Sequence, residues 1–245
     1  MKSGRLMHTK GKPMKLKTVF LAAALALAAN AHAALVEGQD YTVLPKPIPQ
    51  AQADKIEVLE FFGYFCVHCY HLDPILLKHA QSFPADTYLR TEHVVWQPEM
   101  LGLARVAAAV NQSGLKYQAN SAVFQAVYEQ KINLADTATF KQWAAQQKSF
   151  DGQKLIAAYD SFSNQAQAKK MEELTNTYQI SGTPTVIVGG KYQVKFTGDW
   201  NAGMKTIDEL AAKVRSERGM KAPALKPAAA ALKSKGAALA KTANK

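Results

Sequence analysis

Apolar and polar residues along the chain predict a strand, a helix and a second strand in its first half. Residues 56–62, IEVLEFF, are rich in β-branched and aromatic side chains and indicate a buried strand. A helical pattern follows over residues 66–83, and Pro74 inside it should kink the helix. Residues 88–96, YLRTEHVVW, predict the second strand. Such a unit favours a parallel strand pair with a right-handed crossover.

Between residues 97 and 181 the strand pattern disappears and helical periodicity replaces it. Asp136 and Asp151 are placed to act as N-caps within this block. We expect helices over residues 101–111, 119–130, 137–148, 152–162 and 164–180. The sequence therefore predicts an α/β sheet domain that is interrupted by an all-helical insertion.

Strand patterns return after the helical block. Residues 185–196, TVIVGGKYQVKF, give two β-rich runs around Gly189-Gly190 and predict an antiparallel hairpin. Asn201 is placed to cap a final helix. One face of that helix is apolar and carries Met204, Ile207, Leu210, Ala211 and Val214.

The first 33 residues have the pattern of a secretory signal peptide. Basic residues precede an apolar run over residues 19–29, which ends in Ala31-His32-Ala33. We expect cleavage after Ala33 and export of the mature chain to the periplasm. A membrane anchor is the weaker alternative, because the run is well short of the ~20 residues that span a bilayer. Met1 and Met14 both fit as the start of translation.

The net charge of +11 belongs to the two ends of the chain. Residues 1–33 and 219–245 each carry six Lys or Arg and no acidic residue, which leaves 18 basic and 19 acidic residues between them. A nearly neutral body does not favour nucleic-acid binding. Residues 219–245 form a low-complexity Ala/Lys/Pro tail, which we expect to be disordered; a weak contact with anionic lipid or a polyanion is the alternative.

The only two cysteines of the chain, Cys66 and Cys69, directly follow the first predicted strand in FFGYFCVHCY. His68 and His71 lie beside them, but on a helix the four side chains cannot converge on one zinc ion. A purely structural disulfide is compatible with an exported protein, although so small a ring stabilises a fold little. The spacing also suits a redox pair, because residues i and i+3 of a helical turn have Cα atoms roughly 5–6 Å apart.

The start of a helix favours a reactive thiolate at the first cysteine. Cys66 is predicted to lie beside unpaired backbone N–H groups and the positive end of the helix dipole. His68 would add a hydrogen-bond donor near the sulfur, unless it is an ordinary exposed histidine. Cys66 is therefore our expected nucleophilic or electrophilic sulfur, and Cys69 the resolving partner.

Three segments resemble the DsbA-type thiol:disulfide oxidoreductases of the thioredoxin superfamily. Residues 58–74, VLEFFGYFCVHCYHLDP, resemble the active-site segment, residues 37–47, EGQDYTVLPKP, the first strand, and residues 180–194, ISGTPTVIVGGKYQV, the cis-proline segment. The resemblance covers residues 36–218 and implies a thioredoxin-like fold with an inserted all-helical domain. Its parts would be residues 34–98 and 182–218 for the thioredoxin-like domain and 99–181 for the insertion.

The same resemblance implies an enzyme that donates a Cys66–Cys69 disulfide to unfolded, cysteine-containing secreted proteins through a mixed disulfide at Cys66. It implies a monomer without a cofactor or metal, which a DsbB-like, quinone-linked oxidase of the inner membrane would reoxidise. A reductase or isomerase on the same fold is the nearest alternative, since direction depends on reduction potential. A metal-binding or chaperone-like module is the alternative outside catalysis.

The resemblance also assigns roles to residues around the cysteines. Pro184 matches the family's cis-proline, Thr183 the residue whose backbone pairs with substrate, and Glu60 the buried acid that exchanges a proton with the second cysteine. An outward-facing strand carboxylate is the alternative for Glu60, since register alone decides its face. Val67, expected to contact substrate, replaces the proline common between the cysteines and makes the oxidising strength less certain.

Overall fold

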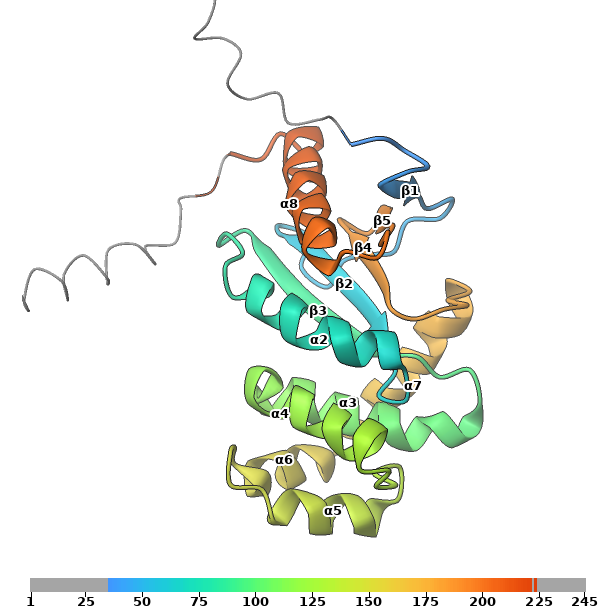
Figure 1. Ribbon diagram of the computed structural model, residues 1–245, viewed down its shortest axis with the longest axis vertical. Helices are drawn as coiled ribbons and strands as arrows, with labels where there is room; N and C mark the ends of the chain where they lie inside the picture. Colours follow the sequence, from blue (N-terminus) through green and yellow to red (C-terminus); the bar gives the residue numbers. More distant parts are fainter. Residues whose placement is uncertain (1–34, 222, 224–245) are drawn as a thin grey trace, which may run out of the picture. The chain divides into compact units, whose positions relative to one another are not determined.

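The computed structural model describes residues 35–221 and 223, so the predicted signal peptide and most of the predicted tail lie outside the described residues. Within them the chain forms one five-stranded sheet with the strand order β1-β5-β4-β2-β3 (Figure 1). The strands are β1 (Tyr41–Val43), β2 (Ile56–Phe62), β3 (Thr87–His93), β4 (Thr185–Val188) and β5 (Tyr192–Val194).

Helices separate and flank these strands. They are α2 (Val67–Ala80), α3 (Leu101–Ser113), α4 (Lys116–Phe124), α5 (Thr137–Ala145), α6 (Gly152–Tyr159), α7 (Asn164–Thr177) and α8 (Trp200–Glu217), with a 3-10 turn η1 (Pro98–Met100) and a π-helical turn η2 (Gln125–Glu129). The order confirms strands on both sides of a helical block.

The central pair of strands has the predicted arrangement. β2 pairs in parallel with β3, from Ile56 opposite Thr87 to Phe62 opposite His93, and every residue of β2 is buried. β4 and β5 form the predicted antiparallel hairpin. Gly189 and Gly190 have φ values of 65° and 71°, a left-handed backbone that glycine adopts at little cost.

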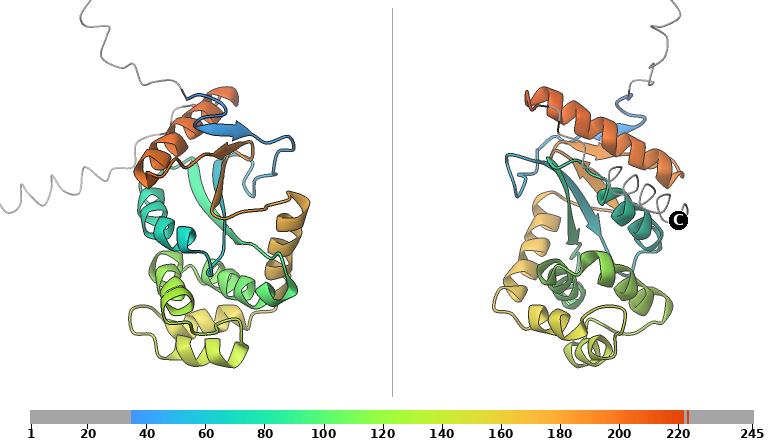
Figure 2. Two further views of the ribbon diagram at one scale, coloured as in Figure 1. Left: turned by 45° about the vertical axis from the view of Figure 1, so that its right-hand side comes forward. Right: turned by 90° about the vertical axis from the view of Figure 1, so that its left-hand side faces the viewer.

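The two faces of the sheet are covered by different helices (Figure 2). Ile56 and Val58 pack in one cluster with apolar residues of α2 and α8. Leu59 and Phe61 point to the opposite face, where they pack in a cluster that includes Leu174 of α7. Because side chains alternate along a strand, Glu60 shares the α2 face with Ile56 and Val58.

The helical insertion has its own core between β3 and β4. Helices α3 to α7 contribute most of one buried cluster, which also contains Phe62, Tyr64 and Cys69 of the active-site segment. The end of β2 and the start of α2 are thus packed against the insertion. This packing gives the insertion direct contact with the segment that carries Cys66 and Cys69.

Several element boundaries differ from the predicted ones. β3 begins at Thr87 and ends at His93 rather than Trp96. The predicted helix over residues 119–130 begins at Lys116 and changes to a π-helical turn after Phe124. The predicted helices over 137–148, 152–162 and 164–180 each end three residues earlier.

Helix caps show two confirmed predictions and one error. Asp136 and Asp151 accept hydrogen bonds from the backbone N–H groups of Thr139 and Lys154, at 2.8 and 2.9 Å. The cap of α8 is Asp199, whose carboxylate accepts from the backbone N–H of Asn201 at 2.8 Å. Asn201 itself is the second residue of the helix, so its assignment as the cap is wrong.

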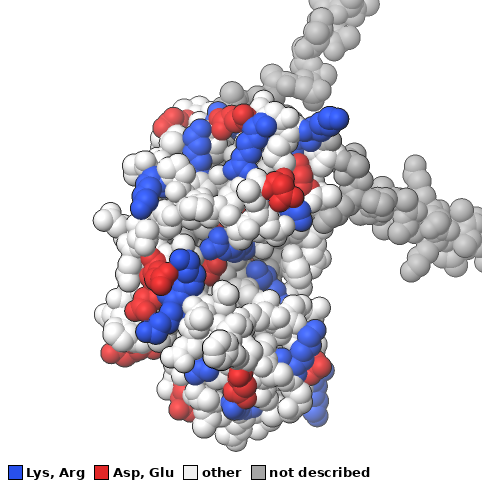
Figure 3. Space-filling model, turned by 180° about the vertical axis from the view of Figure 1, so that it is seen from behind, with Lys and Arg blue, Asp and Glu red and all other residues white. Residues whose placement is uncertain are grey.

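Charged side chains of both signs are interspersed on the face of the molecule drawn in Figure 3. On that face the described residues form no large patch of one sign. This distribution agrees with the nearly neutral balance of the body of the chain.

Candidate active site around Cys66 and Cys69

Cys66 is the N-cap residue of α2, and Cys69 lies in the first turn of that helix. The backbone N–H of Cys69 donates to the Cys66 sulfur at 3.4 Å, so the sulfur takes the place that a serine or aspartate oxygen occupies in other caps. Both residues are free thiols. Cys66 is half-buried and Cys69 fully buried, so only the first sulfur is accessible to a second protein chain.

The environment strongly favours the thiolate form of Cys66. Hydrogen bonding with the side chain of Cys69 lowers the pKa of Cys66, and the side chain of Thr183 and the backbone N–H groups of Cys69 and His68 lower it further, to about 5. Partial burial opposes this shift. The net effect makes Cys66 a thiolate at neutral pH when the pair is reduced.

Cys69 is shifted in the opposite direction. Its hydrogen bond with Cys66, its burial and the nearby Glu60 carboxyl all raise the pKa of the Cys69 thiol well above its ordinary value. The pair is therefore asymmetric, with the negative charge on the exposed sulfur and the proton on the buried one.

The Thr183–Pro184 segment lies against the reactive sulfur, although it is more than a hundred residues away in the sequence. The peptide bond between Thr183 and Pro184 is cis. The carbonyl oxygen of Thr183 is 3.4 Å from the Cys66 sulfur and can accept a hydrogen bond from Cys66 when that residue is protonated. The structure thus brings both predicted residues next to Cys66.

A groove runs from this segment along the outer surface. Its volume is about 610 Å³, and it is lined by Pro184, His68, His71, Trp200 and residues of β5 and the following loop. His68 is exposed and contributes its backbone N–H, rather than its imidazole, to lowering the pKa of Cys66. Val67, the first residue of α2, is partly exposed beside the two cysteines.

Glu60 is buried on the α2 face of the sheet, with 4% of its surface exposed. Burial and the neighbouring Asp73 carboxylate raise the pKa of Glu60 to about 8, against an opposing effect of the Lys116 ammonium. Burial excludes the alternative of an outward-facing carboxylate. Glu60 is consequently protonated at neutral pH, close to the buried thiol of Cys69.

Asp73 was not expected from the sequence as part of this site. It is 3% exposed and accepts hydrogen bonds from Asn120 Nδ2 at 2.5 Å and Ser121 Oγ at 2.6 Å, both on α4. The Tyr64 hydroxyl donates to Asn120 Oδ1 at 2.6 Å. This network joins the loop before Cys66, the redox helix and the helical insertion.

A sequence signal for Asp73 does exist, because it follows Cys69 by four residues and so shares its helix face. Lys116 has no comparable signal. It belongs to α4 of the insertion, and only the fold brings its ammonium near Glu60. Burial lowers the pKa of Lys116 to about 8, against the opposing effect of the Glu60, Glu92 and Asp73 carboxyl groups.

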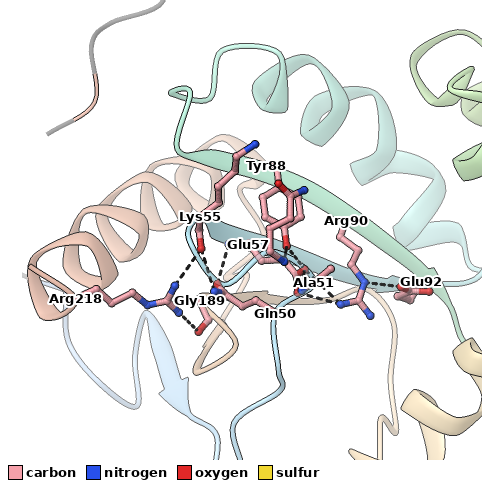
Figure 4. Close-up of polar contacts among 10 residues, drawn as sticks. Gln50, Ala51, Lys55, Glu57, Tyr88, Arg90, Glu92, Gly189 and Arg218 are labelled. Atoms are coloured by element: carbon pink, nitrogen blue, oxygen red, sulfur yellow. Dashed lines mark hydrogen bonds and ion pairs between the residues drawn. The ribbon is translucent and has the colours of Figure 1, made fainter. Parts of the chain in front are cut away.

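A second polar cluster on β2 and β3 is structural rather than catalytic (Figure 4). The buried carboxylate of Glu57 accepts from the Tyr88 hydroxyl at 2.5 Å and the Ala51 N–H at 3.0 Å, and pairs with Arg90 at 3.3 Å. Arg90 also pairs with Glu92 at 2.6 Å. Since Glu57 points to the face opposite Glu60, this cluster holds the loop before β2 and lies away from the cysteines.

Comparison with known proteins decides the family. A family model described as "DSBA-like thioredoxin domain" matches residues 89–215, slightly more than half of the chain. The chain belongs to the DsbA family. The matched range begins after the two cysteines, so the assignment of the redox site rests on its geometry.

Curated relatives and solved structures agree with this family. A thiol:disulfide interchange protein DsbA of Bordetella parapertussis is 33% identical over 197 residues, which cover 78% of this chain and 93% of the relative. A protein of the same name from Pseudomonas aeruginosa is 31% identical over 73% of this chain and 85% of its own length. Members of the family are disulfide oxidoreductases, and so is this protein.

The structural neighbours include close relatives from Neisseria meningitidis. The oxidoreductase NmDsbA3 is 66% identical, covers 76% of this chain and all of its own, and superimposes with a TM-score of 0.69. Reduced DsbA1 is 62% identical over 76% of this chain and 98% of its own, with a TM-score of 0.74. The fold is therefore thioredoxin-like with an inserted helical domain, as predicted.

Proposed function

We propose that this protein oxidises unfolded, exported proteins by donating a disulfide formed between Cys66 and Cys69. The observation that carries the proposal is the asymmetry of the pair, in which the pKa of Cys66 is lowered to about 5 and the pKa of Cys69 is raised. An environment that stabilises the Cys66 thiolate stabilises the reduced protein. Its disulfide is therefore readily passed to another chain.

The first step is attack by a substrate thiolate on Cys66 Sγ, the accessible sulfur of the pair. The new sulfur–sulfur bond forms as the Cys66–Cys69 bond breaks, and the electron pair leaves on Cys69. Burial makes a thiolate at Cys69 unfavourable, so it takes a proton. Glu60, which is protonated at neutral pH and lies nearby, is the donor we assign.

The second step releases the oxidised substrate. A second substrate thiolate attacks the substrate sulfur of the mixed disulfide, and Cys66 leaves as a thiolate. The low pKa of Cys66 makes it a good leaving group. Two substrate thiols have then become one disulfide, and the two electrons reside on the Cys66–Cys69 dithiol.

We infer that residues around Cys66 hold an extended substrate segment. The backbone of Thr183 lies next to the reactive sulfur and has the position of an edge that a substrate strand could pair with. We assign Val67 and Pro184 to the same surface. Pro184 and His68 both line the groove described above, and we assign this groove to one flank of the bound substrate.

We also infer export, reoxidation by a membrane partner and a monomeric state. The signal-peptide pattern of residues 1–33 supports export to the periplasm. Among the described residues no helix combines the length and apolar character needed to cross a bilayer. An inner-membrane, quinone-linked oxidase of the DsbB type is the partner that the family relationship supports, since the cycle leaves Cys66 and Cys69 reduced.

Trapping with a Cys69→Ser variant tests the proposal. Cys66 of the variant is first activated as a mixed disulfide with thionitrobenzoate, which supplies the oxidising equivalent. A reduced, unfolded protein with a single cysteine should then displace thionitrobenzoate and accumulate as a mixed disulfide at Cys66, because neither chain has a second thiol to release it. A Cys66→Ser variant is the matched control and should accumulate none at that position. Absence of mixed disulfides in a folded Cys69→Ser protein contradicts the assigned roles.

The reduction potential separates an oxidase from a reductase or isomerase. Equilibration of the wild-type protein with glutathione should give a value above the roughly −270 mV of thioredoxin. A value at or below that of thioredoxin contradicts the oxidase function. Val67 makes this measurement informative, because the residues between the cysteines tune the potential.

A further inference from the structure

Two exposed aromatic rings lie next to each other beside the reactive cysteine. Phe65 is 36% and Trp96 39% exposed, and their ring centroids are 5.8 Å apart. The other large apolar side chains that are this exposed in residues 35–221 are Val36, Val43, Tyr117 and Phe162. Among these described residues, Phe65 and Trp96 are the two whose rings contact each other.

Both rings are held in place by the fold. The indole N–H of Trp96 donates to the carbonyl oxygen of Ile180 at 2.5 Å. Phe65 packs edge-on against the buried ring of His93, at a centroid distance of 5.7 Å. A side-chain carbon on Gly63 would lie 2.6 Å from Phe65 Cζ, so glycine at this position lets the ring fold back. Rings that are already ordered lose little conformational entropy when a ligand binds them.

The pair lies within reach of a substrate that is bonded to Cys66. Phe65 directly precedes Cys66, and Trp96 is anchored to Ile180, three residues before Thr183. The carbonyl oxygen of Thr183 is 3.4 Å from the Cys66 sulfur. Three extended residues span about 10 Å, so a strand paired along residues 181–183 would bring a side chain two or three positions from its cysteine to Trp96.

The surroundings of the pair suit an apolar side chain. Residues 94–98, VVWQP, and 180–188, ISGTPTVIV, contain no charged residue. The groove lined by His68, Pro184 and Trp200 includes neither Phe65 nor Trp96, so it is a different surface. The two surfaces would receive the two flanks of a bound substrate.

We propose that Phe65 and Trp96 form an aromatic platform that selects substrates with a large apolar side chain two or three residues from the cysteine that bonds to Cys66. The proposal rests on the oxidase function proposed above. Apolar neighbours of a cysteine are accessible before folding and buried afterwards. The platform therefore favours cysteines of chains that have not yet folded.

Rates of peptide oxidation test the platform. Two dithiol peptides carry the same cysteines and differ in having phenylalanine or serine at the second and third positions on both sides of one cysteine. The wild-type protein, supplied in its disulfide form, should oxidise the phenylalanine peptide faster. Trp96→Ala should lower the ratio of the two rate constants about fivefold to tenfold, the size expected for loss of a buried aromatic contact.

Phe162→Ala is the matched control, because Phe162 is an exposed aromatic residue on the helical insertion. It should leave the ratio at the wild-type value. Phe65→Ala provides a second platform variant in case Trp96→Ala does not fold, and should also lower the ratio. An unchanged ratio in a folded platform variant overturns the proposal.

Photo-crosslinking locates the apolar side chain directly. The Cys69→Ser protein is converted to a mixed disulfide with a peptide that carries a photoreactive leucine at the third position on either side of its cysteine. Cross-links should map to Phe65 or Trp96 for one of the two peptides. Cross-links confined to Trp200 and Phe196 in the groove overturn the platform. If the wild-type protein oxidises neither the phenylalanine nor the serine dithiol peptide, the proposed oxidase function itself fails. If it oxidises these two peptides at equal rates, only the platform fails.

Discussion

Glu60 keeps a proton at neutral pH because the fold gives its charge few compensating contacts. Its pKa is raised to about 8 by burial and by Asp73 on α2, while Cys66 adds to the rise and Lys116 on α4 opposes it. A carboxyl group whose pKa is higher in the folded than in the unfolded state destabilises the folded state when it is ionised. Stability should therefore fall as the pH rises from about 4.5 to about 8.

Replacing Glu60 by glutamine should remove this loss of stability at high pH, because glutamine does not ionise. Glu60→Gln is expected to raise the free energy of unfolding of the reduced protein at pH 8, and the gain should shrink toward zero at about pH 4, below the ordinary pKa of a glutamate. Denaturant titrations of both proteins across this pH range measure the difference. A gain that does not depend on pH contradicts the raised pKa.

Glu57 provides the matched control on the same strand. It is also buried, but it pairs with Arg90 at 3.3 Å and accepts from the Tyr88 hydroxyl at 2.5 Å. Glu57→Gln loses the ion pair and leaves Arg90 with less compensation, so this substitution should lower the free energy of unfolding at neutral pH. The two glutamates thus predict effects of opposite sign.

At the scale of an element, Asp199 and Asn201 lie two positions apart at the start of α8, and both are residue types that can cap a helix. Asp199 accepts the backbone N–H of Asn201, whereas Asn201 has already entered the helix. Asp199→Ala should therefore cost about 1 kcal/mol of the free energy of unfolding, the usual loss for a missing N-cap. Asn201→Ala should change it by only a few tenths of a kcal/mol. Equal losses in the two variants would show that the cap is wrongly assigned.

The predicted ends of helices and strands were wrong where apolar residues pack into a different hydrophobic cluster from the one that their sequence pattern suggests. Val94 and Val95 continue the β-branched pattern of β3, yet they pack in two different clusters, one beside Leu59 and the other within the helical insertion. Ile180 continues the helical pattern of α7 but lies in the cluster with Ile187. Periodicity records that a side chain is buried, and it does not record which element buries it.

At the scale of the whole molecule, the sequence predicted those parts of the site that lie close together along the chain. The first helical turn after β2 is a local feature, so Cys66 and Cys69 could be placed from spacing and position alone. Thr183 and Pro184 required the family resemblance, because nothing near them in the sequence points to Cys66. Lys116 could not be predicted, since its effect on Glu60 depends on how the insertion packs against α2.

The redox state should change the stability of the entire protein, because only the reduced form contains the Cys66 thiolate. The folded pKa of Cys66 is about 5, below the ~8.5 of an unfolded thiol. A lowered folded pKa stabilises the protein fully above the unfolded value, and this contribution is lost as the pH falls through about 5. The disulfide closes a very small ring and offers little compensating constraint on the unfolded chain.

The reduced protein should consequently be more stable than the oxidised protein at pH 8, and the difference should shrink as the pH falls toward about 4. Paired denaturant titrations of the two forms at each pH measure it, with Cys66→Ala as a control that cannot form the thiolate. The reduced control should lack the stabilisation that the reduced wild type gains between pH 5 and pH 8. Equal midpoints for the oxidised and reduced wild type at pH 8 would mean that the thiolate is not stabilised, and the driving force proposed for disulfide donation would then be absent.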